Sequence, residues 1–274
     1  MRDISARLPR MIPELDVSVP VGARLRVRGW VEDDWRARTT QERPWPVILI
    51  HGTTVTSGDF EDLAAQLREL GWAVFIPDYG NRATNRIEDS ADQVGAYIHQ
   101  VLHATGADQV IIVGHSQGGV LARWWMRMLG GAHHVRHLVC LASPNHGIQE
   151  AGLLKPFVYT ELQAELTNRA TTTVFGPAGR QQFVGSDFLT ALNADGDTEP
   201  GVSYTCIATR TDSTVVPADS CFLDGPDVQN IWLQELHPRA VVLHTEMPRS
   251  RIVRTLVAET IESLRPSTPH EENP

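Results

Sequence analysis

The sequence predicts an α/β fold with a mostly parallel central sheet flanked by helices. Short apolar runs rich in β-branched residues recur along the chain and have the length of strands buried on both faces. Segments with apolar residues at helical spacing separate these runs. Strands that alternate with helices form βαβ units, and such units pair their strands in parallel. The 274 residues suffice for one large domain of this kind, and they contain no internal repeat.

The predicted elements follow one another from residue 47 onward. Strands are expected at 47–50, 73–76, 110–113, 135–141 and 203–208, with a last short one at 230–233. Helices are expected where apolar residues recur every three or four positions, at 60–70, 87–101, 117–129, 187–193 and 252–264. Gly71, Gly106 and Gly130 follow three of these helices, a common position for C-terminal glycines. Ser57 is a suitable N-cap for the first helix.

The chain divides into four segments of different character. Residues 1–44 contain scattered prolines and a stretch compatible with a strand at 24–31, and we interpret them as an N-terminal arm on the domain edge. Residues 45–264 form the single predicted catalytic domain. Within it, residues 148–201 break the alternation and are expected to form a cap or lid, or else irregular surface helices without a gating role. Residues 265–274 are polar and are expected to form a flexible tail.

Composition excludes several classes of function. The net charge of −9 and the lack of any Lys- or Arg-rich run argue against a nucleic-acid-binding surface. No cysteine or histidine spacing fits a metal site, so no metal or cofactor is expected, although Cys206 and Cys221 are compatible with one disulfide. No apolar segment approaches the roughly 20 residues of a transmembrane helix. The first residues lack a secretory signal pattern, so we expect a cytoplasmic monomer, or a secreted one if a signal was removed.

The segment Gln109–Leu121 carries the strongest functional motif. A buried-strand pattern runs directly into Gly114-His115-Ser116-Gln117-Gly118, and a helical pattern follows at once. This is the G-x-S-x-G arrangement, in which a serine lies on a strained strand-to-helix turn with its hydroxyl exposed. A Cβ atom at 114 or 118 would clash where strand and helix cross. The motif predicts Ser116 as a nucleophile.

A serine nucleophile needs a base and an acid that orients the base. Behind a G-x-S-x-G turn, the acid precedes the histidine in the chain. Asp212 follows the 203–208 strand and is the preferred acid, with Asp219 as the alternative. His244 follows an apolar run just before the last helix and is preferred over His237.

The oxyanion of the reaction needs backbone N–H donors. One is expected from Gln117, at the start of the helix after the serine, and the other from Thr53, after the first strand. The Thr53 hydroxyl is a candidate third donor. His115 is expected to point away from the substrate, and His51 is expected to be a structural hydrogen-bonding group.

The set HGTT, GHSQGG, SPNHG, TRTD and HTEM resembles the bacterial triacylglycerol lipase/esterase family of the α/β-hydrolase superfamily, above all its actinobacterial branch. The resemblance covers residues 45–264. It implies an α/β-hydrolase fold, the nucleophile–acid–base set Ser116, Asp212 and His244, and oxyanion donors at Thr53 and Gln117. Members of the family are commonly secreted with signal peptides and disulfides. This sequence departs from them because its first residues do not show a signal-peptide pattern.

The expected function is hydrolysis of carboxylic esters with aliphatic acyl chains, as in a carboxylesterase or triacylglycerol lipase, through an acyl-enzyme. The substrate is expected to be a small-molecule or lipid ester. The expected substrate-binding residues are Thr54 and the apolar residues of the insertion, Leu153, Leu154, Phe157 and Val158. An acyltransferase or thioesterase with the same three residues is the main alternative. A non-catalytic ligand-binding protein is less well supported, because it has no chemical need for all three.

Overall fold

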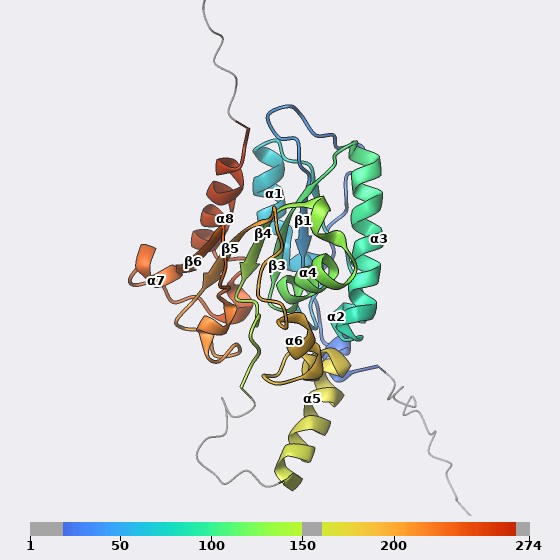
Figure 1. Cartoon of the computed structure of the whole chain (residues 1–274), viewed down its shortest axis with the longest axis vertical. Coiled ribbons are helices and arrows are strands. Elements are labelled where there is room, and N and C mark those ends of the chain that lie inside the picture. The colour runs from blue at the N-terminus through green and yellow to red at the C-terminus, as the bar shows by residue number, and fades with distance from the viewer. Residues whose placement is uncertain (1–18, 150–160, 267–274) are drawn as a thin grey trace, which may run out of the picture.

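The computed structural model of the chain describes residues 19–149 and 161–266, and for 161–170 it describes only the course of the backbone (Figure 1). A single sheet forms its centre, with strand order β2-β1-β3-β4-β5-β6. In chain order the strands are β1 Val47–Ile50, β2 Val74–Phe75, β3 Val110–His115, β4 Val135–Leu141, β5 Ser203–Ala208 and β6 Val228–Trp232. Each neighbouring pair is parallel, which confirms the predicted fold class.

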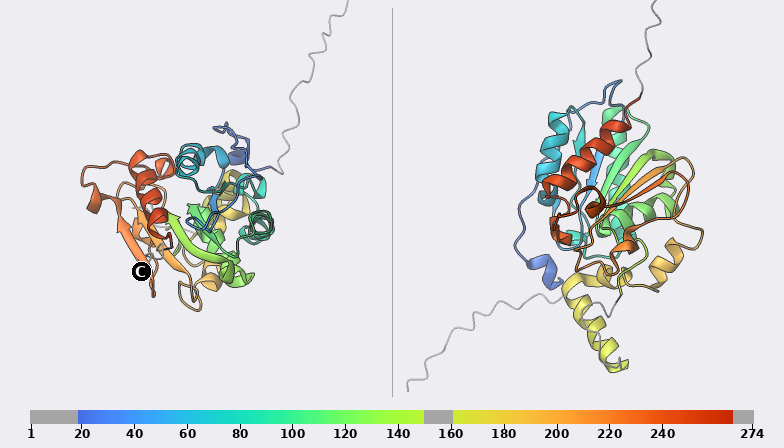
Figure 2. Two further views of the ribbon diagram at one scale, coloured as in Figure 1. Left: turned by 90° about the horizontal axis from the view of Figure 1, so that it is seen from above. Right: turned by 90° about the vertical axis from the view of Figure 1, so that its left-hand side faces the viewer.

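Helices cover both faces of the sheet, as Figures 1 and 2 show. The longer ones are α1 Glu61–Glu69, α3 Ile87–Thr105, α4 Gln117–Met128, α5 Glu161–Gln181 and α8 Arg251–Ser263. The short α-helices are α2 Gly80–Ala83, α6 Asp187–Leu192 and α7 Leu233–Leu236. The 3₁₀ turns are η1 Val21–Arg24, η2 Ser57–Phe60, η3 Gly131–His134, η4 Ala218–Cys221 and η5 His244–Glu246. None of the helices in the described residues is both long and apolar enough to cross a bilayer.

The alternation of side chains along β1 divides the core into two halves. Ile48 and Ile50 pack with α3 and α4, whereas Val47 and Leu49 pack with α1 and α8. Because all four side chains are buried, the strand is a continuous apolar run rather than an alternating one. This is why the sequence pattern located the strands well.

Two predictions in the N-terminal part were wrong in detail. The residues 24–31 form no strand. Just after them, the Asp33 carboxylate accepts a hydrogen bond from the Ile76 N–H, next to the edge strand β2, at 2.8 Å. Ser57 is not an N-cap, because its hydroxyl donates to the Asp78 carboxylate at 2.7 Å. Ser57 opens the turn η2, and α1 begins only at Glu61.

The segment 148–201 contains more helix than its sequence suggested. The polar run 171–173 lies within α5, and the helix is kinked at Gly176, which has φ 67° and precedes Pro177. In Figure 1, α5 and α6 lie together at the lower end of the molecule. A Cβ atom on Gly176 would overlap the Thr84 carbonyl, so the kink brings the helix onto the loop before α3. The predicted residues Leu153, Leu154, Phe157 and Val158 lie outside the described residues.

Candidate active site

Ser116 lies on a strained turn between β3 and α4. Its backbone has φ 53° and ψ −125°, a conformation that is costly for a residue with a side chain. A Cβ atom on Gly118 would overlap the Ile50 carbonyl oxygen, and one on Gly114 would overlap the backbone of Gly119. The glycines therefore allow the strand and helix to cross closely enough to form this turn.

A chain of hydrogen bonds joins Ser116, His244 and Asp212. His244 Nε2 lies 3.0 Å from Ser116 Oγ, and His244 Nδ1 lies 2.8 Å from Asp212 Oδ2. Ser116 and His244 are buried, and the Asp212 side chain is only 1% exposed. The alternatives Asp219 and His237 are both exposed, and neither contacts these three residues.

The Asp212 carboxylate is held from its other side. Its Oδ1 accepts hydrogen bonds from the backbone N–H groups of Thr214 and Val215, both at 2.8 Å. The segment before His244 is held by the Thr211 hydroxyl, which donates to the Val242 carbonyl at 2.8 Å. Both partners of Ser116 are therefore fixed by the loops that carry them.

His115, the residue before the serine, is buried and belongs to the residues around the same pocket. Its Nε2 lies 3.0 Å from the His244 carbonyl oxygen and donates to it, which adds a further restraint on His244. Burial lowers the pKa of His115 well below its ordinary value, so its ring is neutral near pH 7. His51, by contrast, stacks on Tyr79 with ring centroids 4.5 Å apart and does not line the pocket.

Thr53 and Gln117 meet beside the serine. Gln117 is the first residue of α4, and a Cβ atom on the neighbouring Gly52 would lie 3.1 Å from Ser116 Cβ. Among the described residues, neither the Thr53 nor the Gln117 backbone N–H has a hydrogen-bond partner. The Thr53 hydroxyl, however, donates to Gln117 Oε1 at 2.6 Å. It is therefore occupied and does not serve as a third oxyanion donor in this conformation.

Gln182, just after α5, is a site residue that sequence reasoning missed. It is buried, and its Nε2 lies 3.3 Å from both Thr53 Oγ1 and Gln117 Oε1 and 3.1 Å from the Ala178 carbonyl. It thereby ties the end of α5 to both residues expected to carry the oxyanion donors. No motif marks it, since a glutamine after a helix has no distinctive sequence pattern.

A cavity of about 560 Å³ opens above Ser116, within the usual range for small-molecule sites. The loop after β1, including Thr54, forms one wall, and α5 and the residues after it form another. The loop after β5 and His244 with Thr245 complete it. Phe175, Phe183, Ile148 and Val216 give the cavity an apolar lining.

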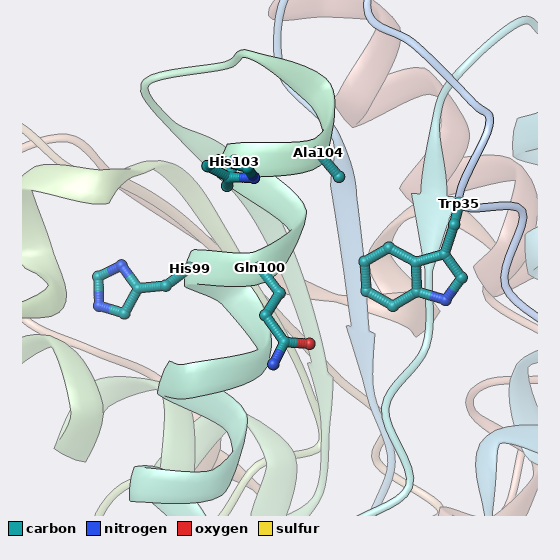
Figure 3. A pocket seen from close by; sticks show the side chains of 5 residues that line it. All are labelled: Trp35, His99, Gln100, His103 and Ala104. Carbon is teal, nitrogen blue, oxygen red and sulfur yellow. The ribbon is translucent and has the colours of Figure 1, made fainter.

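A second hollow lies elsewhere, against the outer side of α3. Figure 3 shows Trp35 of the N-terminal segment facing Gln100 and Ala104 of the helix, with His99 and His103 nearby. It shares no residue with the cavity above Ser116. Across the described parts of the chain, no three His, Cys, Asp or Glu side chains gather as a metal site would require.

Comparisons with known proteins agree with the fold. The family described as alpha/beta hydrolase fold matches residues 46–180. A triacylglycerol lipase of Pseudomonas fragi is 29% identical over 154 residues, which are 54% of this chain and 48% of the lipase. A lysosomal thioesterase PPT2 homolog of Drosophila melanogaster is 27% identical over 213 residues, 68% of each chain. The chain spans about half the length of the Pseudomonas fragi lipase, and 41% and 37% of the length of two further bacterial triacylglycerol lipases.

The solved structure of Aspergillus fumigatus lipase B superposes with a TM-score of 0.66 at 18% identity, covering 85% of this chain and 56% of the lipase. At 18% identity, this similarity is evidence for the fold alone. The parallel sheet, the strained serine turn after β3 and the match over residues 46–180 agree with one another. The chain has the α/β-hydrolase fold.

Proposed function

We propose that this protein is a serine hydrolase of carboxylic esters, in which Ser116, His244 and Asp212 form the catalytic triad. The observation that carries the proposal is the hydrogen-bond chain from Ser116 Oγ through the His244 ring to the buried Asp212 carboxylate. A serine hydroxyl is a weak nucleophile without such a base. A histidine that keeps Nδ1–H on a carboxylate presents Nε2 as the base.

The reaction proceeds in two steps. His244 Nε2 takes the Ser116 proton as the hydroxyl oxygen attacks the ester carbonyl, and the same nitrogen then gives that proton to the leaving alcohol. Water repeats the sequence on the acyl-enzyme and releases the carboxylic acid. Asp212 stays ionised and stabilises the imidazolium form of His244.

The backbone N–H groups of Thr53 and Gln117 are the proposed oxyanion donors. Support comes from their positions near Ser116, since Gln117 follows it in the chain and Gly52 before Thr53 packs against it, and from their lack of a partner among the described residues. The Gln117 amide also lies at the N-terminus of α4, where the helix dipole favours negative charge. Losing one such donor typically costs about 3 kcal/mol of transition-state stabilisation.

The substrate class follows from the cavity lining. Phe175, Phe183 and Ile148 offer apolar contacts to an aliphatic acyl chain. Since α5 contributes part of this wall, residues 148–201 are proposed to act as a cap over the site. The match to triacylglycerol lipases supports an ester substrate for this chain as well.

A thioesterase is the second candidate, because the relative that aligns over 68% of this chain is named as one. The same triad attacks either kind of acyl bond. Paired oxygen esters and thioesters of one acyl chain separate the two, since the better substrate has the higher kcat/KM.

The proposal is tested with p-nitrophenyl esters from acetyl to palmitoyl. We expect hydrolysis by the wild type, and a loss of about 10⁴-fold or more in kcat for Ser116→Ala and His244→Ala. His237→Ala is the matched control and should retain full activity. That histidine is exposed, and among the described residues its hydrogen bonds are to the backbone of Leu233 and Ala240. No turnover of any ester or thioester, together with no labelling of Ser116 by a fluorophosphonate, would refute the proposal.

A further inference from the structure

Asp59 is a buried carboxylate in the wall of the cavity above Ser116. It belongs to the turn η2, is only 7% exposed, and lines the cavity together with His244 and Thr245. Its backbone N–H donates to the Thr56 carbonyl at 3.1 Å. No step of the proposed mechanism uses its side chain.

The Asp59 carboxylate has no hydrogen-bond partner among the described residues, and no basic nitrogen of those residues lies within 4.0 Å of it. The carboxylate of Asp78, beside the same turn, is 37% exposed and nevertheless has protein partners. Asp78 accepts hydrogen bonds from the Ser57 N–H at 2.8 Å and from the Ser57 hydroxyl at 2.7 Å. Buried carboxylates are normally paired in this way, so the isolation of Asp59 requires an explanation.

One of the positive charges that act on Asp59 belongs to Arg249, which contacts the residue after His244. Arg249 and the exposed Arg28 act on it through their charge, without pairing with it. The Arg249 guanidinium donates instead to the carbonyl of Thr245, the residue after His244, at 2.7 Å. Because His244 delivers the proton to the departing alcohol, the alcohol part of an ester leaves from the side of His244.

We propose that Asp59 binds a hydrogen-bond donor, a hydroxyl or a protonated amine, on the alcohol part of the ester substrate. The inference rests on the proposed ester hydrolysis at Ser116. A carboxylate inside a cavity gains most from a ligand that supplies the missing donor, and it repels esters whose alcohol part carries an anion. The cavity thus combines an apolar wall for the acyl chain with one polar group for the alcohol.

The test uses two pairs of butyrate esters that differ by a single group. In the first pair, 2-hydroxyethyl butyrate is compared with propyl butyrate, so that a hydroxyl replaces a methyl. In the second, protonated 2-(dimethylamino)ethyl butyrate is compared with 3-methylbutyl butyrate, so that an ammonium N–H replaces a C–H. The readout is the ratio of kcat/KM for the donor ester to that for its alkyl partner, which distinguishes the hydroxyl from the ammonium source.

We expect at least one wild-type ratio to exceed unity by about 10-fold, the scale of a hydrogen bond to a charged group. Asp59→Leu should abolish that preference. Asp59→Asn should abolish a preference for the ammonium ester but keep part of one for the hydroxyl ester, since an amide oxygen still accepts. Asp62→Asn is the matched control, because Asp62 is an exposed carboxylate of the next helix outside the cavity, and its ratios should equal those of the wild type.

Equal ratios in the wild type and in both Asp59 variants, with alkyl esters readily hydrolysed, would overturn the role of Asp59 and leave the proposed hydrolysis standing. A wild type that hydrolyses none of the four esters and none of the p-nitrophenyl esters would overturn the hydrolysis itself, and the role of Asp59 with it.

Discussion

Three hydrogen bonds fix the Asp212 carboxylate, and each oxygen has a separate task. Oδ1 accepts from the Thr214 and Val215 N–H groups, which set the orientation of the side chain. Oδ2 then faces His244 Nδ1 at 2.8 Å. An asparagine in this position fills the same space, but its NH₂ group can donate to Nδ1 and so favours the tautomer with a proton on Nε2.

Asp212→Asn is therefore expected to lower kcat by about 10⁴-fold while leaving the fold intact, because a His244 that carries its proton on Nε2 cannot accept one from Ser116. Stopped assays of ester hydrolysis at pH 7 measure the loss, and circular dichroism checks the fold. Asp219→Asn is the control and should be as active as the wild type. If Asp219→Asn caused the larger loss, Asp219 would be the acid.

Sequence reasoning found the candidate site residues that lie next to clear apolar patterns. Ser116 comes directly after β3 and Asp212 lies just beyond β5. His244 follows the apolar run 240–243, which forms no strand, and precedes α8. Sequence reasoning missed Asp59 and Gln182, because each lies in or beside a helical segment with no motif around it. Only the folded chain shows that these two side chains reach the cavity.

Among the elements, α5 is a helix that the spacing of apolar residues in the sequence does not predict. Its polar run 171–173 and its kink at Gly176 interrupt the apolar pattern. What holds its end is contact with distant parts of the chain, since the Gln181 side chain accepts from the Ile87 N–H at 2.8 Å and donates to the Glu88 carboxylate at 2.5 Å. The strands, by contrast, could be predicted from the sequence alone, because their buried side chains form continuous apolar runs.

The end of α5 also reaches the oxyanion residues, through Gln182. Gln182→Ala removes the amide that bridges Thr53 and Gln117, so both residues gain freedom next to Ser116. We expect kcat for p-nitrophenyl esters to fall by about 10-fold with little change in KM, because the loss affects the transition state more than substrate binding.

Gln229→Ala serves as the control for this change, since Gln229 is an exposed residue of β6, and it should leave kcat unaltered. A Gln182→Glu variant that recovers no activity agrees with the need for an amide donor. A rise in KM at constant kcat in Gln182→Ala would contradict this role and indicate substrate binding instead.

For the molecule as a whole, burial of histidine couples stability to pH. Burial lowers the pKa of His51, His115 and His137 below the ordinary value. The folded state keeps these rings neutral, whereas the unfolded state takes up protons near pH 6.5. The unfolded state therefore binds more protons as pH falls, and the protein should lose stability between pH 7 and pH 4.

His137 allows this coupling to be measured without disturbing the site around Ser116. It lies on β4, where its ring nitrogens contact the hydroxyls of Ser203 at 2.7 Å and Thr205 at 3.1 Å. Burial, and then the charge of Arg136, lower its pKa to about 4. The contribution of His137 to the free energy of unfolding is fully present above pH 6.5. It falls as the pH drops towards 4, by about 2 kcal/mol between pH 7 and pH 5.

His137→Gln keeps a donor and an acceptor in this place but removes the titrating ring. The drop in Tm from pH 7 to pH 5 should therefore be smaller than in the wild type by about 4 °C or more. Thermal unfolding followed by circular dichroism at the two pH values gives the comparison. His103→Gln, a change at an exposed position on α3, should show the wild-type drop. A wild-type drop in His137→Gln as well would mean that His137 takes up its proton without unfolding, and that the acid sensitivity has its origin in the other buried rings.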